Sequence, residues 1–248
     1  MARIALWMLC LLPPLAWGET ARVAVAANFA ATFATLADRF AATGHHRVVA
    51  SPGATGKLVA QILHGAPFDL LLAADEASVD LLVARGRVRP QDRYVYAEGI
   101  LVLWSADSRR SPSPELLQDP ALQRVALPNP RHSPYGRAAL AALGRLAPGR
   151  GDLEHLYGES VAQTLVFVER GGAPVGFVAL AQVGDAGGVA RGSGYLVPAA
   201  FHPPLRQTAA LLERGRRNPA ALAFWEFLRG AEARRVIEAA GYRRGEAG

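Results

Sequence analysis

Short apolar runs alternate with helical periodicities along the first part of the chain, which predicts an α/β fold. Apolar runs bounded by turn residues predict buried strands at 22–27, 47–50 and 69–73. Apolar side chains that recur every three or four residues predict helices at 28–44, 57–64 and 78–84. Strands and helices joined by short connections are typical of a parallel, doubly wound sheet.

The alternation restarts after a strongly strand-like run at 99–105. Later strands are predicted at 124–127 and 174–179, and later helices at 134–146, 160–169, 219–228 and 231–239. Two α/β units in one chain predict two lobes with a ligand cleft between them. We expect each lobe to be a doubly wound, mostly parallel sheet with flanking helices.

The N-terminus has the three parts of a cleaved secretory signal. Arg3 gives a basic start, residues 4–15 are almost wholly apolar, and Ala16 and Gly18 place small residues before Glu19. The apolar run is roughly a dozen residues, against the ~20 that span a bilayer. We therefore predict a signal peptide at 1–18, export to the periplasm and no permanent anchor.

Cys10, the single cysteine, lies inside this predicted signal. The residues before it lack the small side chain expected beside a lipid-modified cysteine, so we expect no lipid anchor. A mature chain that begins at Glu19 has no cysteine, which excludes disulfides, cysteine–metal sites and thiol nucleophiles. Export also argues against nucleotide chemistry, because the bacterial periplasm holds little ATP or NAD.

Composition and charge narrow the possible partners. The chain is 51% hydrophobic and 19% charged, which is typical of a folded protein. Its net charge of +6 raises the question of nucleic-acid binding, but the basic residues are spread along the chain without a basic run. We expect no nucleic-acid partner, and we interpret Lys57 as a solvated helix residue. A weak positive field would still help an anion to arrive.

A glycine-rich loop follows the second predicted strand, but it is not a P-loop. Ser51 stands where a P-loop needs glycine, and Leu58 stands where it needs serine or threonine. Gly53 and Gly56 permit backbone geometries that direct successive N–H groups at one anion. Thr55 can either cap its own helix or donate its hydroxyl to a ligand.

Three other predicted helices begin with residues that suit both capping and anion binding. Asn28 is a good N-cap, and the same helix end offers free N–H groups and the positive end of a dipole. Ser133 and Pro134 form an ordinary cap pair before Tyr135, and Ser160 opens a helix in the same manner. Helix starts of doubly wound sheets follow the strand ends where ligands bind. Four such helix starts predict an anion-binding site whose hydrogen-bond donors are mostly uncharged.

Metal and hydrolase sites are poorly supported. None of the six histidines lies four residues from another, and no HExxH pattern exists. The GxSxG pattern of serine hydrolases is absent, because Arg191 stands at the glycine position before Ser193. We therefore predict no catalytic residues and no metal bound directly by side chains.

At this point the chain resembles the periplasmic molybdate-binding proteins of ABC importers. The resemblance covers nearly all of the mature chain and rests on landmarks in the same order and spacing. These landmarks are the segments 25–29, 53–58, 61–62, 65–70, 134–136, 168–170 and 173–176.

The resemblance implies a two-lobed type II binding protein that closes over an oxyanion, molybdate and with it tungstate, without a paired cation. Carried over by position, the ligand contacts fall on Asn28, Ala54, Thr55, Tyr135 and Val161, with Ala54 and Val161 acting through backbone N–H groups. It implies no cofactor, no enzymatic activity, and delivery of the oxyanion to an ABC transporter membrane permease. We expect a monomer.

The expected N-terminal lobe comprises residues 19–96 and 207–248, and the second lobe comprises 97–206. One departure from the family concerns Ala179, which stands where many members have a tyrosine ligand. Tyr135 is expected to supply that hydroxyl from another helix. The choice among molybdate, tungstate, sulfate and other anions stays open at the level of sequence.

Two alternatives remain. The same fold can bind sulfate, phosphate or an organic acid, although a carboxylate normally needs a bidentate arginine, for which Arg131 is the candidate in the predicted loops. A periplasmic enzyme would use Tyr135, His132 or Asp75 as acid or base.

Overall fold

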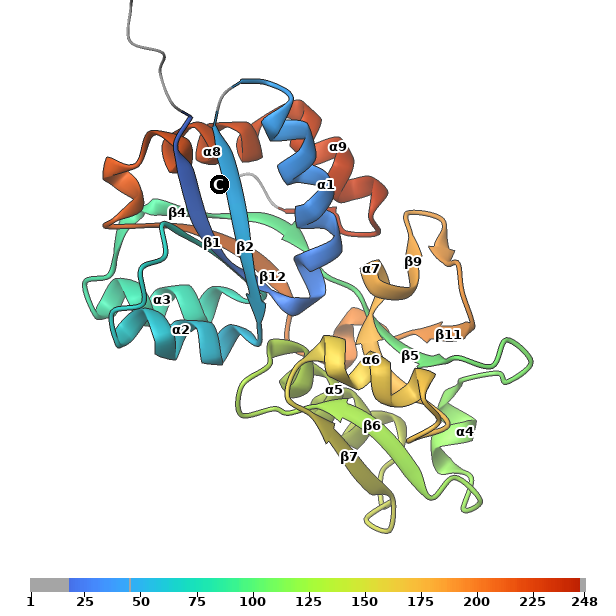
Figure 1. Cartoon of the computed structure of the whole chain (residues 1–248). Coiled ribbons are helices and arrows are strands. Elements are labelled where there is room, and N and C mark those ends of the chain that lie inside the picture. The colour runs from blue at the N-terminus through green and yellow to red at the C-terminus, as the bar shows by residue number, and fades with distance from the viewer. Residues whose placement is uncertain (1–17, 45, 246–248) are drawn as a thin grey trace, which may run out of the picture.

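The computed structural model describes residues 18–44 and 46–245. The predicted signal peptide up to Trp17, with Cys10, lies outside the described residues. The chain forms two lobes, each built on one β-sheet with helices on both faces (Figure 1). The predicted two-lobed α/β fold is thus confirmed.

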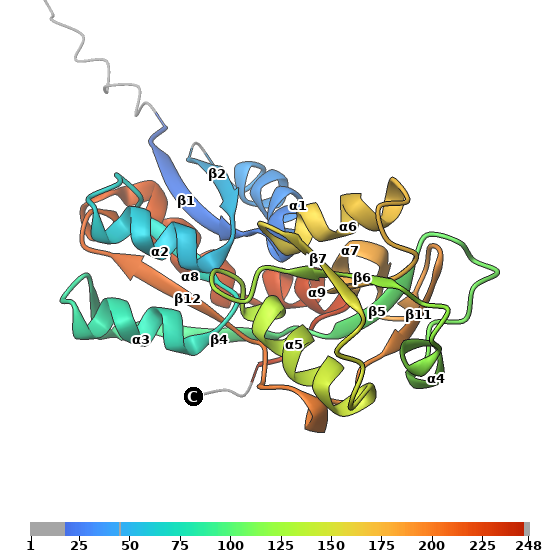
Figure 2. The same cartoon turned by 90° about the horizontal axis from the view of Figure 1, so that it is seen from below.

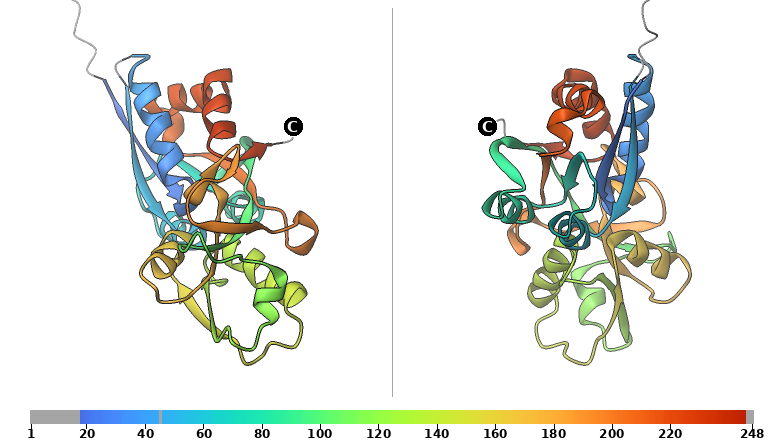
Figure 3. Two further views of the ribbon diagram at one scale, coloured as in Figure 1. Left: turned by 90° about the vertical axis from the view of Figure 1, so that its right-hand side faces the viewer. Right: turned by 60° about the vertical axis from the view of Figure 1, so that its left-hand side comes forward.

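The first lobe contains a six-stranded sheet in the order β13-β4-β12-β3-β1-β2. Its strands are β1 (Thr20–Ala26), β2 (Arg47–Gly53), β3 (Leu70–Ala73), β4 (Val88–Glu98), β12 (Arg206–Leu212) and β13 (Arg243–Arg244). Its helices are η1 (Ala27–Phe29), α1 (Ala30–Ala41), α2 (Thr55–Leu63), α3 (Glu76–Ala84), η3 (Gly215–Arg217), α8 (Pro219–Arg229) and α9 (Ala231–Ala239). The C-terminal helices therefore return to the first lobe, as Figure 3 shows.

The second lobe contains a five-stranded sheet in the order β11-β5-β8-β6-β7. Its strands are β5 (Leu101–Ser105), β6 (Arg124–Pro128), β7 (Glu154–Gly158), β8 (Gly176–Ala179) and β11 (Ser193–Leu196). Its helices are α4 (Pro114–Gln118), α5 (Pro134–Leu146), α6 (Val161–Glu169), α7 (Leu180–Val183) and η2 (Ala199–Phe201). A small hairpin of β9 (Gly184–Asp185) and β10 (Gly188–Val189) follows α7.

The sheets are mixed, so the expectation of mostly parallel sheets was wrong. The parallel part of each sheet is three strands wide, β2-β1-β3 in one lobe and β7-β6-β8 in the other. The remaining strands pair antiparallel. The reason is topological: β4, β5, β11 and β12 flank the segments that cross between the lobes, and the chain must leave and re-enter each sheet in opposite directions.

Successive side chains of a strand point to opposite faces of the sheet, so each lobe has one packed cluster of side chains on each face of its sheet. In β5, Leu101 and Leu103 face the cluster under α5, whereas Val102 and Trp104 face the cluster under α6. Figure 2 shows these two helices on opposite sides of the sheet. Buried strands that are covered on both faces read as continuous apolar runs, which is why the sequence revealed them.

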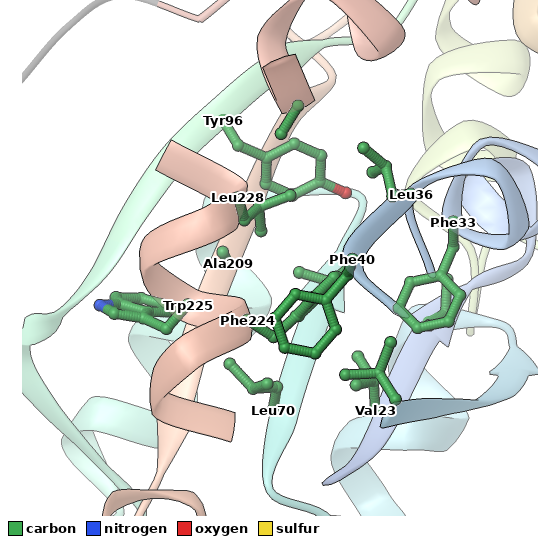
Figure 4. Packing of buried hydrophobic residues seen from close by; sticks show 14 of the residues in the cluster. Val23, Phe33, Leu36, Phe40, Leu70, Tyr96, Ala209, Phe224, Trp225 and Leu228 are labelled. Atoms are coloured by element: carbon green, nitrogen blue, oxygen red, sulfur yellow. The ribbon is translucent and has the colours of Figure 1, made fainter. Parts of the chain in front are cut away.

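The core of the first lobe is rich in aromatic side chains (Figure 4). Phe224 of α8 packs edge-on against Phe33 and Phe40 of α1, with ring centroids 5.6 and 5.2 Å apart. Full burial of such a side chain contributes about 1.5–3 kcal/mol. This packing fixes the position of α1. It thereby also fixes the end of β1, which leads into α1.

Two segments link the lobes, one between β4 and β5 and one between β11 and β12. They contact each other, because the Gly99 N–H donates to the Leu205 carbonyl at 2.9 Å. In the ranges 18–44 and 46–245, no helix combines the length and the apolar character needed to cross a membrane.

Candidate functional site

The four helix starts singled out in the sequence meet between the two lobes. Ala26 at the end of β1 and Ala74 after β3 belong to the same buried cluster as Tyr135 and Val161 of the second lobe. Helix α6 contacts η1, and the two lobes also exchange a main-chain hydrogen bond beside α2. The carboxyl ends of strands from both sheets therefore converge on one buried region.

Asn28 lies in this region and is 3% exposed, but it does not cap a helix. The chain leaves β1 through the 3₁₀ turn η1, which places Asn28 inside a turn, so that Phe29 and not Asn28 stands at the N-cap position of α1. Its Nδ2 group donates to Gln207 Oε1 at 2.8 Å and to the Tyr242 hydroxyl at 3.0 Å. The capping interpretation of Asn28 was wrong.

Ala54 and Thr55 form the start of α2, with Ala54 at the N-cap position and Thr55 first in the helix. Both are buried, at 6% and 1% exposure. Thr55 does not cap its helix; its Oγ1 accepts the Ala74 N–H at 3.2 Å. A hydroxyl that accepts one bond still has its own hydrogen to donate, so Thr55 can serve the backbone and a ligand together.

The glycines of this loop have a different role from the predicted one. Neither Gly53 nor Gly56 adopts a positive φ. The Gly56 N–H is not directed at an anion, because it donates to the His132 carbonyl of the other lobe at 2.8 Å. A β-carbon on Gly56 would lie 3.1 Å from the His132 α-carbon. Glycine is needed here because the two lobes approach each other closely.

Tyr135 follows the predicted cap pair. The Ser133 hydroxyl accepts the Gly136 N–H at 3.3 Å, and Pro134 occupies the first turn. Tyr135 is 1% exposed, and its hydroxyl has no hydrogen-bond partner among the described residues. Burial raises the pKa of Tyr135 well above its ordinary value, so the hydroxyl stays protonated and remains a donor.

Val161 begins α6 and is 3% exposed. The Ser160 hydroxyl caps the helix by accepting the Gln163 N–H at 3.3 Å, and Gln163 Oε1 accepts the Glu159 N–H at 2.6 Å. This arrangement differs from a capping box, because the Gln163 side chain bonds the N–H of the residue before the cap and not that of Ser160 itself. It leaves the N–H of Val161 without an acceptor inside its own helix, as is general for first-turn amides.

Ion pairs bridge the lobes at the rim of this region. Lys57 of α2 pairs with Glu159, which precedes α6, and the Lys57 ammonium holds the pKa of the Glu159 carboxyl below its ordinary value. Asp75 pairs with Arg137 of α5 and also caps α3 by accepting the Ser78 N–H at 3.2 Å. Lys57 is therefore engaged across the lobes and not simply solvated.

Two further residues considered in the sequence analysis are Ala179 and Arg131. Ala179 is fully buried in the second-lobe core, where it ends β8 and stands at the N-cap position of α7, so a methyl group stands where a tyrosine ring was considered. Arg131 is exposed, and its N–H donates to Asn129 Oδ1. Within the part of the chain that the structure describes, no group of three or more metal-ligating side chains lies together.

Sequence reasoning missed three residues at this site: Gly99, Gln207 and Tyr242. Gln207 is fully buried in β12, between strands of the first-lobe sheet, and its neighbours along the strand are Arg206 and Thr208. In the sequence Gln207 thus reads as one of three successive polar residues, which gives no sign of burial. Tyr242 and Gly99 carried no signal either, since the roles of all three residues depend on contacts with distant segments.

Comparisons with known proteins agree with this architecture. Residues 21–243 match the family model described as bacterial extracellular solute-binding protein. The chain is 40% identical to molybdate-binding protein ModA of Azotobacter vinelandii over 89% of this chain and 88% of that protein. It is 36% identical to ModA of Rhodobacter capsulatus, with 92% and 90% covered. The solved structure of the Azotobacter vinelandii periplasmic molybdate-binding protein superposes with a TM-score of 0.85 at 34% identity, over 91% of this chain and all of that one.

Proposed function

Because the chain belongs to the bacterial extracellular solute-binding proteins and, within them, groups with the molybdate-binding proteins, we propose that it captures molybdate between its two lobes. Tungstate, which has the same charge and shape, binds at the same place. The protein acts in transport by an ABC importer and is a binding protein, not an enzyme.

The observation that carries this proposal is the convergence of four helix starts from both lobes on one buried region. First-turn N–H groups and the hydroxyls of Thr55 and Tyr135 are neutral donors, which suit a fully deprotonated tetrahedral dianion. Asn28, Ala54, Thr55, Tyr135 and Val161 form the proposed contact set. Closure of the lobes around the anion removes it from water and strengthens each hydrogen bond.

Two further steps complete the proposed role. The chain would work in the periplasm after removal of the signal peptide, as a monomer, and the closed pair of lobes would dock on the membrane permease. This is supported by the periplasmic location of the similar Azotobacter protein and by contacts that tie the lobes together, such as Gly56 to His132.

The alternatives are less well supported by the geometry. An organic acid needs a bidentate arginine, but Arg137 is paired with Asp75 and Arg131 is exposed. Of the candidates for an acid–base enzyme, Asp75 both caps α3 and forms an ion pair, and burial raises the pKa of Tyr135 well above its ordinary value. Selectivity for molybdate over sulfate then rests on the size of the space between the donors, since charge and shape are equal.

The test is thermal unfolding of the mature protein with molybdate, tungstate, sulfate and phosphate at matched ionic strength. A ligand at 100 times its Kd adds about 2.7 kcal/mol, which is roughly 5–11 °C in Tm for a chain of this size. Molybdate and tungstate should produce this shift and sulfate should not. The absence of a shift with all four anions would refute the proposal.

A further inference from the structure

The side chains of Asn28, Gln207 and Tyr242 form a network of hydrogen bonds. Gln207 Nε2 donates to the Leu205 carbonyl at 2.8 Å and to the Ala74 carbonyl at 3.3 Å. Gln207 Oε1 accepts from Asn28 Nδ2, and Asn28 Nδ2 also donates to the Tyr242 hydroxyl. The Tyr242 hydroxyl in turn donates to the Asn28 main-chain carbonyl at 2.9 Å.

The network fixes which way each amide faces. Two carbonyl acceptors face Gln207 Nε2, so its Oε1 must be the atom that faces Asn28. Only an N–H donor satisfies that oxygen, so Asn28 must present Nδ2 to it. The Tyr242 hydrogen is committed to the Asn28 carbonyl, so the Tyr242 oxygen can only accept the second Nδ2 hydrogen.

Both side-chain hydrogens of Asn28 are therefore used inside the protein. An amide NH₂ has two donors, and the remaining side-chain atom, Oδ1, is an acceptor with nothing to offer an oxyanion. The donor that Asn28 retains for an anion is its own main-chain N–H, which lies in the η1 turn and, like its first-turn neighbours, has no acceptor within the helix.

We infer that Gln207 and Tyr242 are positioning residues of the oxyanion site, which hold Asn28 so that the main chain at the end of β1, and not the Asn28 amide, faces the anion. The inference rests on the proposed function. It extends the site to the segment after α9 and to β12, the strand that returns from the second lobe.

The position of Gln207 gives the network a further consequence. Leu205, whose carbonyl it holds, also accepts the Gly99 N–H from the other crossing segment. The network thus joins the ends of β1 and β3 to both segments that link the lobes. A change at Gln207 or Tyr242 is therefore expected to disturb the segments that link the lobes.

The test compares two tyrosine-to-phenylalanine variants of the full mature chain. Tyr242 and Tyr96 both pack on Phe29, with ring centroids 5.3 and 5.0 Å away, and both are buried. The Tyr96 hydroxyl has no partner among the described residues, so Tyr96→Phe is a matched control for the same chemical change. Molybdate affinity is measured by calorimetry at a temperature where all variants are folded.

Tyr242→Phe should weaken molybdate binding about ten-fold, and Tyr96→Phe by less than about two-fold. If the Asn28 amide were itself the donor, Tyr242→Phe would free one N–H for the anion, and affinity would hold or rise. The effect of Tyr242→Phe should also be smaller in an Asn28→Ala background, because the two residues act as one unit. A structural role alone would lower Tm without this coupling.

The outcomes separate the inference from the proposed function. An unaltered chain that binds none of the four anions contradicts both. Tight molybdate binding by the unaltered chain, with equal affinity for Tyr242→Phe and Tyr96→Phe, overturns only the inference. If Tyr242→Phe does not fold, Gln207→Met replaces it, since it removes the acceptor for Asn28 while keeping the side-chain length. Undiminished molybdate affinity of Gln207→Met would equally overturn the inference.

Discussion

The hydroxyl of Tyr135 lies directly against the α-carbon of Gly99, so that a β-carbon at position 99 would overlap the phenolic oxygen. Gly99 belongs to a segment that links the lobes, and Tyr135 begins the first turn of α5. A candidate ligand donor of the second lobe thus lies against a segment that links the lobes. The space for it exists only because residue 99 has no side chain.

Gly99→Ala should destabilise the protein by roughly 1–3 kcal/mol, the usual cost of overpacking a buried site. Chemical denaturation checks this, and the double change Gly99→Ala with Tyr135→Phe should recover part of the loss because the overlapping oxygen is gone. Gly144→Ala is the control: position 144 lies in α5 with open space around it, so alanine should stabilise by about 0.5–1 kcal/mol. Equal effects at both positions would contradict the close contact.

Tyr135→Phe should separate stability from binding. The hydroxyl is buried without a partner among the described residues, so its removal should leave Tm unchanged or slightly raised. Molybdate affinity should nevertheless fall by about ten-fold or more, because one neutral donor is lost. Calorimetric titration and thermal unfolding on the same sample test this, and an unchanged affinity would remove Tyr135 from the contact set.

Thr55→Val should cost about 1 kcal/mol of folding stability, because the Ala74 N–H loses its acceptor, and should also weaken molybdate binding. Thr43→Val is the matched control, since the Thr43 hydroxyl bonds the Phe40 carbonyl at the far end of α1. The control should lose stability but keep its affinity. If both variants bind like the unaltered chain, Thr55 is a structural residue.

The ion pairs at the rim should slow the escape of the ligand. Lys57→Ala removes the pair with Glu159 and should raise the molybdate dissociation rate by roughly two- to five-fold at low salt. Both side chains are about half exposed, so the difference should shrink as ionic strength rises. Stopped-flow measurements at two salt concentrations test this; a difference that is independent of salt would point to a cause other than charge.

The protein should lose stability at alkaline pH and not between pH 6 and 9. Burial raises the pKa of Tyr94, Tyr96, Tyr135 and Tyr242 above the ordinary value near 10. In the folded state each holds its proton more tightly than in the unfolded chain, so its contribution is complete below pH 10 and is lost as pH rises further. Tyr96→Phe should flatten the fall in Tm above pH 10.

The sequence predicted the role of some residues near the site correctly and of others wrongly. The caps at Ser133 and Ser160 were predicted correctly, because capping is set by neighbours three residues away. Asn28 looked like a cap by the same rule, and this was wrong, because a 3₁₀ turn intervenes before α1. The contact set itself stays a prediction that the variants above test.

The sequence by itself determined the lobes, the alternation of strands and helices, and the helix starts that converge between the sheets, because hydrophobic periodicity and capping are local signals. Only the tertiary structure decided which contacts the residues at those helix starts make. Asn28 meets partners 179 and 214 positions away, and Gly56 and Gly99 are glycines because His132 and Tyr135 arrive from the other lobe. Such contacts depend on how two sheets dock, and no spacing along the chain encodes that geometry.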